Sequence, residues 1–402
     1  MLETFRQLLL CLALSVNAVA GAAGVNASAA PGGEGIAESK LIEVYKLVGA
    51  GQSRQALVQA EALVRQFPTF QLAQLVHGDL LAARMRPVSS FGDVREGMTQ
   101  AVNQNLQELR SEAQLRIAAL KHRPVQGTVP AQFLKLSALN KHAIAIDVSR
   151  GRLYLFEHKA GSIRLVSDYY ISVGKAGVGK SVEGDQRTPL GLYFITSNLN
   201  PKRLKDLYGS GALPINYPNA YDVRRGKTGS GIWLHGTPSN QFSRAPQATD
   251  GCVAVANPDL QRIIQTVEIQ STPVLITQRL TWVRQQDLAP ESAGFDATLD
   301  KWTQAKSTGD MRGLLSLYAP DFAADGKQLE DYQQLLQQEV ARLAGRALRL
   351  AEVSVLGWSD DAQVRVVTFS QTVTGVRGQR IMRQYWERRG KSWQIVYETA
   401  LR

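Results

Sequence analysis

Cysteine is scarce in this sequence of 402 residues, which contains only Cys11 and Cys252. Cys11 falls within the apolar run Leu8–Val16, and the Ala-Val-Ala of residues 18–20 follows that run as the cleavage site of an export signal would. The run is shorter than the ~20 residues that a membrane span requires. We therefore expect residues 1–20 to be a signal peptide, the alternative being a short membrane anchor that is never cleaved.

Removal of that signal would leave Cys252 as the single cysteine, which excludes an internal disulfide in the mature chain. In an oxidising compartment a thiol without a purpose is a liability, so Cys252 is either buried and inert or does chemistry. Histidine is also rare, with five residues in the whole sequence. Cysteine and histidine form no cluster at ligand spacing, so we expect no metal and no other cofactor.

Acidic residues are outnumbered, since Lys and Arg total 46 against 35 Asp and Glu, a net charge of +11. The excess is concentrated in residues 141–285, which hold 18 basic and 10 acidic side chains. A basic exported domain suits an anionic or carboxylate-rich partner outside the cytoplasm, although the same charge would also make a merely soluble surface. No nucleic-acid recognition motif accompanies the charge, so we expect no nucleic-acid partner.

Changes in composition and hydrophobic period divide the rest of the chain. Residues 21–35 are mostly Gly, Ala and Ser, which indicates a flexible leader. Residues 36–123 have the period of amphipathic helices, with Gly51, Ala56 and Pro68 where a tetratricopeptide helix pair would have its turn glycine, small packing residue and closing proline. We predict a helical, repeat-like module there; a plain helical hairpin that packs on the next domain is the alternative.

Strands dominate the middle of the sequence. Residues 140–280 contain alternating segments such as HAIAIDVSRGRLYLFEH and GLYFITSNLN, with one expected helix near Asp259–Thr266. Residues 281–294 include proline, serine and glycine and are expected to be a linker. Residues 295–402 are expected to form three helices followed by four strands. The expected helices are Phe295–Thr308, Met311–Tyr318 and Leu329–Leu343. The sequence therefore predicts a multidomain chain with an α-helical module, a mainly-β domain and an α+β domain.

SVGKAGVGKS at residues 172–181 matches the short pattern of a nucleotide-binding phosphate loop. Such a loop needs a helix immediately after its Ser or Thr, because the first amide groups of that helix hold the phosphates. Here Gly184, Pro189 and Gly191 follow Ser181 within ten residues, and no helical period is present. We therefore expect a hairpin loop and no nucleotide partner.

A candidate nucleophile and its base lie near the end of the β-rich region. His235 ends an expected strand seventeen residues before Cys252. An imidazolium next to a thiol favours the thiolate and lowers the thiol pKa, so His235 is the natural base for Cys252. Gly251 can adopt a backbone conformation that turns neighbouring amide groups toward an oxyanion. A strand-end histidine and a glycine turn are each common alone, but their combination with a lone cysteine favours catalysis.

Residues 140–280 resemble the L,D-transpeptidase (YkuD-type) catalytic domain. The resemblance depends on AIAIDVSRGRLYLFE, on VGKAG…GDQRTPLGLY, on the His-Gly-Thr of residues 235–237 and on the Thr-x-Gly-Cys of residues 249–252. It implies that Cys252 attacks the carbonyl between the third residue, a diamino acid, and the D-Ala of a peptidoglycan stem peptide, with His235 as base and acid. It also implies a supporting or oxyanion-hole role for Thr249, Asp250, Gly251 and Gly236.

Two positions depart from the family pattern. The residue before Gly251 is often histidine in the family and is Asp250 here. A carboxylate that points at the thiol would oppose the thiolate, so the role of this side chain stays open. The residue two after the cysteine is often arginine and is Ala254 here, which removes an anchor for a substrate carboxylate. This second departure bears on the substrate and the acceptor more than on the chemistry.

Residues 295–402 resemble the nuclear transport factor 2-like (SnoaL-like) cone fold, in which helices precede a curved four-stranded sheet. The segment has no histidine and no evident pair of carboxylates. We therefore expect a binding or dimerising module in preference to a second active site.

Together these features predict an exported L,D-transpeptidase of cell-wall biogenesis and cell shape, in the periplasm or cell envelope. It would form a Cys252 thioester with peptidoglycan stem peptides, release D-Ala and pass the acyl group to an amine. One alternative is the same chemistry used for hydrolysis, as an L,D-carboxypeptidase or a linkage-cleaving enzyme. Another is a non-catalytic wall-binding scaffold. A second wall or envelope protein could bind the helical module or the C-terminal domain.

Overall fold

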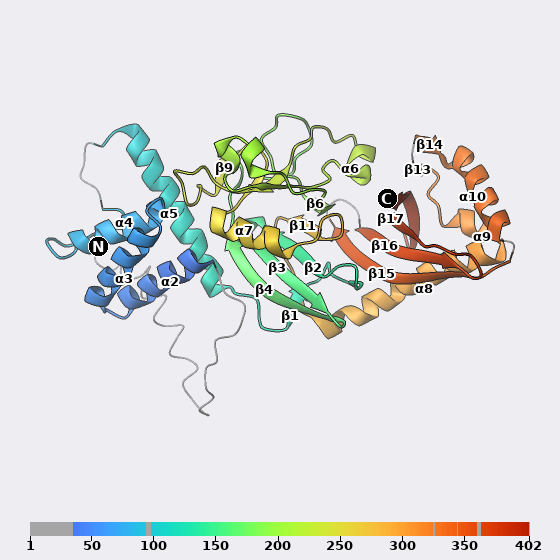
Figure 1. Ribbon diagram of the computed structural model, residues 1–402, viewed down its shortest axis with the longest axis horizontal. Coiled ribbons are helices and arrows are strands. Elements are labelled where there is room, and N and C mark those ends of the chain that lie inside the picture. The colour runs from blue at the N-terminus through green and yellow to red at the C-terminus, as the bar shows by residue number, and fades with distance from the viewer. Residues whose placement is uncertain (1–34, 94–97, 325, 344, 360–362, 402) are drawn as a thin grey trace, which may run out of the picture.

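The computed structural model describes residues 35–93, 98–324, 326–343, 345–359 and 363–401. The helical module, the β-rich domain and the C-terminal domain follow one another along an elongated molecule (Figure 1). The expected signal peptide and all but the last residue of the expected leader lie outside the described residues. No helix in the described part of the chain is long and apolar enough to cross a membrane.

Four helices of the described residues form the N-terminal module: α2 (Ile36–Gly49), α3 (Ser53–Gln66), α4 (Gln71–Ala82) and α5 (Gln100–Lys121). α2 packs on α3, and α3 on α4, through buried side chains spaced three or four residues apart, such as Ala56, Ala60 and Leu63. Gly51 has a φ of 74° in the turn between α2 and α3. The expected turn glycine therefore lies where the chain takes a left-handed conformation.

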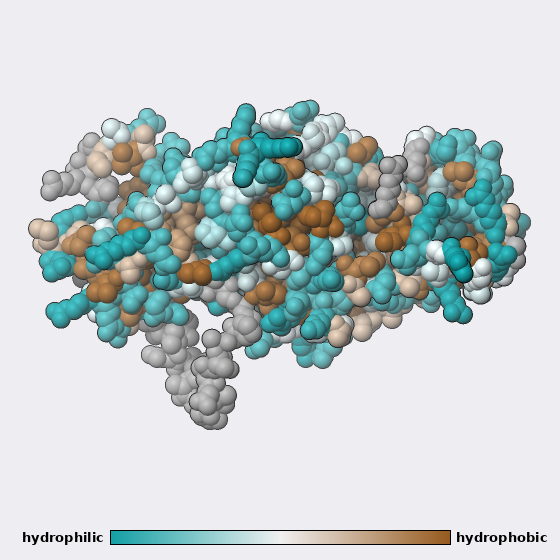
Figure 2. All heavy atoms as spheres, viewed as in Figure 1, coloured by the Kyte–Doolittle hydropathy of each residue, from teal (hydrophilic) through white to brown (hydrophobic). Residues whose placement is uncertain are grey.

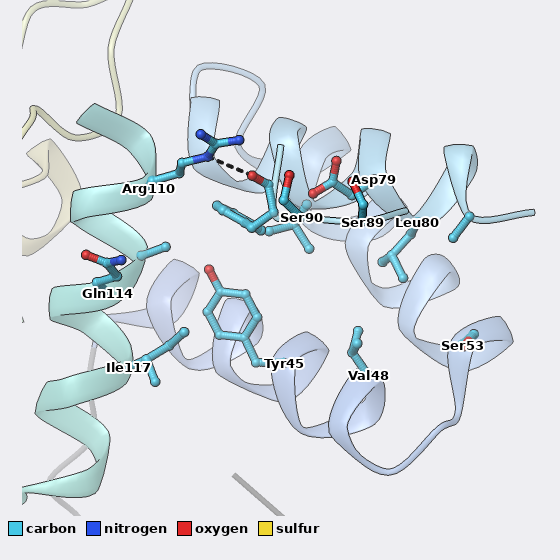
Figure 3. A pocket seen from close by; sticks show the side chains of 14 residues that line it. Tyr45, Val48, Ser53, Asp79, Leu80, Ser89, Ser90, Arg110, Gln114 and Ile117 are labelled. Carbon is cyan, nitrogen blue, oxygen red and sulfur yellow. Dashed lines mark hydrogen bonds between the residues drawn. The ribbon is translucent and has the colours of Figure 1, made fainter. Parts of the chain in front are cut away.

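An apolar pocket of about 300 Å³ lies among α2, α4 and α5. Figure 3 shows the ring of Tyr45 between α2 and α5, with its hydroxyl group in the pocket. Arg110 of α5 donates to the carbonyl oxygen of Phe91 at 2.8 Å, and the Asp79 carboxylate of α4 accepts from the amide of Gly92 at 2.7 Å. These bonds hold the loop after α4 against the helices, and this loop forms one wall of the pocket.

Buried ion pairs join this module to the β-rich domain. The carboxylate of Glu38 in α2 accepts from Arg152 of the β-rich domain at 2.7 Å and pairs with Arg116 of α5 at 2.8 Å. Arg152 also donates to Asp168 at 2.6 Å, and Arg116 to Glu112 at 2.7 Å. Each of Glu38, Arg116 and Arg152 is at most 4% exposed. Opposite charges thus compensate one another out of reach of water, which holds the module on the sheet.

A five-stranded sheet forms the centre of the β-rich domain, in the order β4-β3-β2-β11-β6. Its strands are β2 (His142–Asp147), β3 (Arg152–Lys159), β4 (Ser162–Tyr170), β6 (Gly191–Phe194) and β11 (Pro273–Thr277). Alternate residues face opposite sides: Ala143 and Ala145 share a core with the C-terminal domain, whereas Ile144 and Ile146 belong to a second core. Burial on both faces explains the nearly continuous apolar run in β2.

A smaller sheet covers the second core and carries the candidate active site. Its order is β10-β8-β7, with β7 (Ala212–Pro214), β8 (Trp233–His235) and β10 (Val253–Ala254). Helix α7 (Asn257–Thr266) follows directly and buries Leu260 and Ile263 in the same core. β8, β10 and α7 therefore pack together on this second core, whereas Phe242, in the loop between β8 and β10, packs against the helical module.

The stretch 281–294, expected to be a linker, is structured. β12 (Trp282–Arg284) pairs with β1 (Thr128–Pro130), and α8 (Ala289–Thr308) begins inside the stretch. Proline lies in the first turn of α8, where its missing amide proton costs nothing, so this proline marks a helix start.

In the described residues of the C-terminal domain, three helices accompany a four-stranded antiparallel sheet, which confirms the predicted multidomain fold class. After α8 come α9 (Met311–Ser316), α10 (Leu329–Leu343), β15 (Leu348–Ser359), β16 (Gln363–Val373), β17 (Arg380–Arg389) and β18 (Ser392–Leu401). Tyr385 of β17 stacks on Tyr221 of the β-rich domain, with ring centroids 6.4 Å apart. One face of this sheet therefore packs against the β-rich domain.

Candidate active site

Cys252 and His235 come together because strands β10 and β8 are parallel neighbours. Ala254 pairs with His235, so Cys252, two residues earlier, lies opposite Trp233. The amide of Trp233 donates to the Sγ atom of Cys252 at 3.4 Å. The thiol also donates to the carbonyl oxygen of Gly231 at 3.4 Å, so it lies beside the start of β8, the strand that ends at His235.

A backbone carbonyl fixes which nitrogen of His235 carries the proton. Nδ1 lies 2.6 Å from the carbonyl oxygen of Gly236, and that oxygen can only accept a hydrogen bond. Nδ1 is therefore protonated, which leaves a lone pair on Nε2. The ring is 2% exposed and packs edge-on against Tyr208, with centroids 5.2 Å apart. His235 is thus a buried, oriented base.

Burial makes this cysteine–histidine pair neutral at rest. Desolvation lowers the pKa of His235 to about 4 and raises the pKa of Cys252 to about 11. The sequence suggested that an imidazolium would lower the thiol pKa. The structure differs, because both groups lie where charge is poorly solvated. A thiol at this site would therefore have to lose its proton before or during any attack on a substrate.

Iodoacetamide labelling of Cys252 is expected to become about tenfold faster per pH unit between about pH 7 and about pH 9. The reason is that the thiolate fraction rises in that proportion at any pH well below the thiol pKa. Intact-mass spectrometry of the labelled protein as a function of time measures the rate. A rate that is independent of pH near neutrality would contradict the expectation and indicate a preformed thiolate–imidazolium pair.

The turn before Cys252 requires glycine. Gly251 has a φ of 122°, and a Cβ atom placed on it would lie 2.8 Å from the carbonyl oxygen of Arg187. The Thr249 hydroxyl donates to the carbonyl oxygen of Cys252 at 2.6 Å, and Thr188 donates to that of Gly251 at 2.9 Å. These bonds fix the backbone of the Thr-x-Gly-Cys segment. Thr188 was not among the sequence-predicted site residues; its Thr-Pro turn was the available signal.

The amide groups around the thiol differ in availability. In the described part of the chain, the amides of Asp250 and Cys252 make no hydrogen bond, so both can donate to an oxyanion. The amide of Gly251 donates to the Thr249 hydroxyl at 3.2 Å. The amide of Gly236 donates to the carbonyl oxygen of Tyr208 at 3.0 Å. Gly236 therefore acts by orienting His235 and does not supply an oxyanion donor.

The two departures from the family pattern have distinct structural outcomes. The carboxylate of Asp250 is exposed and pairs with Lys175 at 2.9 Å. Its charge still contributes to raising the pKa of the thiol, behind the larger effect of burial. Ala254 is buried in β10, and its backbone pairs with that of Ser172. Alanine at position 254 has no side chain that could extend to a substrate carboxylate, as the family arginine would.

Arg244 provides a cation near the thiol from another segment. Its pKa is lowered by burial and raised by the charges of Asp250 and Cys252, which indicates that its guanidinium lies within electrostatic reach of both. The hydroxyl of Tyr170 donates to the carbonyl oxygen of Arg244 at 3.0 Å and so fixes the backbone of this loop. Sequence reasoning missed Arg244 because no motif links it to the cysteine.

The glycine-rich loop forms no phosphate cradle. Lys180, the lysine of the nucleotide-loop pattern, is 4% exposed and pairs with Asp185 at 3.0 Å. The segment after Ser181 is irregular, and the amide of Gly179 donates to the carbonyl oxygen of Thr188 at 2.9 Å. The loop folds back on Thr188 as a hairpin would, and the lysine is already neutralised.

The described fold thus places a lone cysteine and an oriented histidine at two neighbouring strands of one domain. Residues 141–276 match the L,D-transpeptidase catalytic domain (YkuD), and residues 295–399 match the Cds6 C-terminal NTF2-like domain. The chain thus contains an L,D-transpeptidase catalytic domain followed by an NTF2-like domain. The catalytic domain supports an enzyme that modifies peptidoglycan, the substrate that this domain implies.

Two solved structures are similar over most of their own length. Bd1075 from Bdellovibrio bacteriovorus has a TM-score of 0.59 and 25% identity, over 68% of this chain and 98% of its own. The helical cell shape determining protein Pgp2 from Campylobacter jejuni has a TM-score of 0.54 and 22% identity, over 67% of this chain and 95% of its own. None of the curated proteins matches the chain.

Proposed function

We propose that the protein is exported to the periplasm or cell envelope and acts there as an L,D-transpeptidase on peptidoglycan stem peptides. The observation that carries the proposal is the tautomer of His235. The carbonyl of Gly236 holds the Nδ1 proton, which leaves Nε2 unprotonated on the strand that pairs with β10, directly after Cys252. This arrangement suits a base that takes a proton from a thiol and returns it to a leaving group.

The reaction begins when Nε2 of His235 takes the thiol proton and sulfur bonds to the carbonyl carbon before D-Ala. The amides of Asp250 and Cys252 donate to the oxyanion. The carbon–nitrogen bond breaks as His235 returns the proton to the D-Ala nitrogen, which leaves a thioester on Cys252. An acceptor amine then attacks the thioester, its proton passes to His235, and the thiol is regenerated.

Water in place of the amine would make the same thioester a hydrolytic intermediate. Ala254 is the observation that favours this second candidate, because a family anchor for a substrate carboxylate is missing there. Arg244 supplies a cation close to the thiol and can hold a stem-peptide carboxylate in either reaction. The similar protein Pgp2 determines helical cell shape in its own organism, and we extend a role in cell shape to this protein as part of the proposal.

Incubation of purified tetrapeptide muropeptides with the wild-type protein is expected to give dimers joined between two diamino acids. Cys252→Ala should give none, because it has no atom that can form the thioester. Mass spectrometry of the products measures both. Loss of D-Ala without dimers would assign the hydrolytic reaction. Unchanged muropeptides with both proteins would contradict catalysis and favour a wall-binding scaffold.

A protein partner for the helical module or the C-terminal domain remains part of this proposal. The module offers the apolar pocket of Figure 3 as a surface for such a partner.

In the interior of the C-terminal domain, the Glu398 carboxylate accepts from Tyr318 at 3.0 Å, from Tyr332 at 2.8 Å and from Gln384 at 2.8 Å. Three neutral donors therefore stabilise this carboxylate, which supports a binding or structural role for the domain over a second catalytic one.

A further inference from the structure

A pocket of about 550 Å³ lies between the β-rich domain and the C-terminal domain. The β-rich domain contributes residues 137–141, 194–196, 216 and 268–271, and the C-terminal domain contributes Thr368, Ile381, Arg383 and Leu401. The two domains meet where β6 contacts β15 of the C-terminal sheet (Figure 1). Apolar residues gather on the surface in this middle region of the molecule, whereas polar residues cover most of the rest of this face (Figure 2).

Arg383 of β17 is the buried charged side chain of this pocket, and it has no carboxylate partner among the described residues. The residue is 7% exposed. Its Nε donates to the Thr368 hydroxyl at 3.0 Å, and its guanidinium carbon lies 3.3 Å from the ring centroid of Phe194. Among the described residues, no carboxylate lies within ion-pair distance of Arg383. A guanidinium has five N–H donors, so four remain without a hydrogen bond in the described structure.

The other deeply buried arginines of the described chain are compensated. Arg152 and Arg116 share Glu38 and have further carboxylates, and Arg365, on the same sheet as Arg383, pairs with Glu291. Burial lowers the pKa of Arg383 to about 10, as expected for a guanidinium without a neighbouring carboxylate. A buried charge without a partner destabilises a protein, so its retention here calls for an external partner.

The carboxylate that lines the same pocket is already engaged. Glu268 lies 3.1 Å from Nδ1 of His142 and also accepts from the hydroxyl of Thr272 at 3.4 Å. Lys141 adds a second positive charge to the lining. The pocket therefore offers unused positive charge and hydrogen-bond donors to an anionic ligand.

We propose that this interdomain pocket binds a carboxylate ligand, which pairs with the guanidinium of Arg383. Phe194 stacks on the flat face of the guanidinium, which leaves its edge to donate two parallel hydrogen bonds to one carboxylate. The choice of a carboxylate as the ligand class rests on the proposed function. A peptidoglycan stem peptide carries free carboxylates, and the proposed reaction releases D-alanine, which also has one. The ligand would touch both domains, so its binding would couple the C-terminal domain to the catalytic domain.

The test uses the full chain with Cys252→Ala, so that no probe is consumed. Calorimetric titrations use three probes: the tetrapeptide L-Ala-γ-D-Glu-meso-diaminopimelate-D-Ala, free D-alanine, and D-alaninamide, which has no carboxylate. Each probe is titrated into the Cys252→Ala protein, into the same protein with Arg383→Met, and into a matched control with Arg365→Met. Arg365 is also a buried arginine of the C-terminal sheet, but it already has a carboxylate partner.

We expect one carboxylate-dependent binding event to weaken at least about 30-fold with Arg383→Met and to persist with Arg365→Met, because a desolvated charge pair loses one partner. If Arg383→Met weakens the binding of the tetrapeptide alone, the ligand is a stem peptide. If it weakens the binding of D-alanine alone, the ligand is the free amino acid. Either result supports the proposal. Equal binding with and without Arg383→Met, or no carboxylate-dependent binding apart from the active site, overturns it.

Thermal unfolding without a ligand separates binding from a structural role. Arg383→Met should unfold at the same or a higher temperature than its parent, because methionine removes an uncompensated charge, whereas Arg365→Met should unfold lower. A lower unfolding temperature for Arg383→Met with unchanged binding would assign Arg383 to structure only and overturn the proposal.

If Arg383→Met does not fold, Arg383→Lys is used in its place. Lysine keeps the charge but lacks the planar fork, so this variant should bind the ligand about tenfold more weakly. Muropeptide turnover by the wild-type protein is measured separately, so failure of the proposed reaction is distinguishable from failure of this site.

Discussion

Glutamine in place of His235 is expected to lower kcat for release of D-Ala by about 10³-fold, within the range that general acid–base catalysis contributes. The thiol pKa of about 11 makes the effect large, because so little thiolate forms without a base. Glutamine is polar and similar in size, so it leaves the strand pairing of β8 intact. Single-turnover release of D-Ala, measured by mass spectrometry, gives the rate.

The control is His158→Gln, which changes a histidine of the same domain outside the site. Nδ1 of His158 bonds to the carbonyl oxygen of Ser137, away from the β8–β10 pair. The His158→Gln protein should release D-Ala at the same rate as the wild-type protein. A loss of less than about tenfold with His235→Gln would mean that another group takes the thiol proton.

Glutamine in place of Glu38 is expected to reduce the free energy of unfolding by about 1.5–3 kcal/mol, the usual contribution of hydrogen bonds to a charged group. Glu38 compensates both Arg152 and Arg116, and all three side chains are shielded from water. Loss of this charge removes the carboxylate that Arg152 and Arg116 share across the junction between the helical module and the sheet, although each keeps one other carboxylate partner. The midpoint of the first urea transition, followed by circular dichroism, measures the change.

The matched control is Glu43→Gln on the same helix, since Glu43 forms an exposed pair with Lys46 at 3.7 Å. That substitution should change the unfolding free energy by less than about 0.5 kcal/mol, because exposed ion pairs contribute little. Equal effects of the two substitutions would show that the buried network does not hold the module in place.

Regular local patterns made much of the fold predictable. The period of Leu329–Leu343 predicted helix α10 with the bounds that the structure has. The alternation around Arg150 predicted the β2–β3 pair, because strand residues alternate between two buried faces. The expected linker at 281–294 was wrong in its local structure, since its proline begins helix α8. Proline is common both in linkers and in the first turn of a helix, and only the packing of the residues that follow distinguishes the two cases.

The sequence was enough to propose the residues of the candidate site but not their charge state. A lone cysteine after a glycine, with a histidine at a strand end, was enough to single out Cys252 and His235. The protonation of the pair depends on desolvation, which is set by chain segments distant in sequence. Arg244 also escaped prediction, because a cation near the thiol is recognised by proximity in space.

The sequence by itself determined most of the helices and strands and which cysteine is the candidate nucleophile, because periodicity and residue chemistry are local properties. The tertiary structure alone decided which charges are compensated. Glu38 meets Arg152 across 114 positions of the chain, whereas Arg383 meets the ring of Phe194 and no carboxylate in the described residues. Neutralisation of a buried charge depends on contacts between distant segments, and no local pattern encodes them.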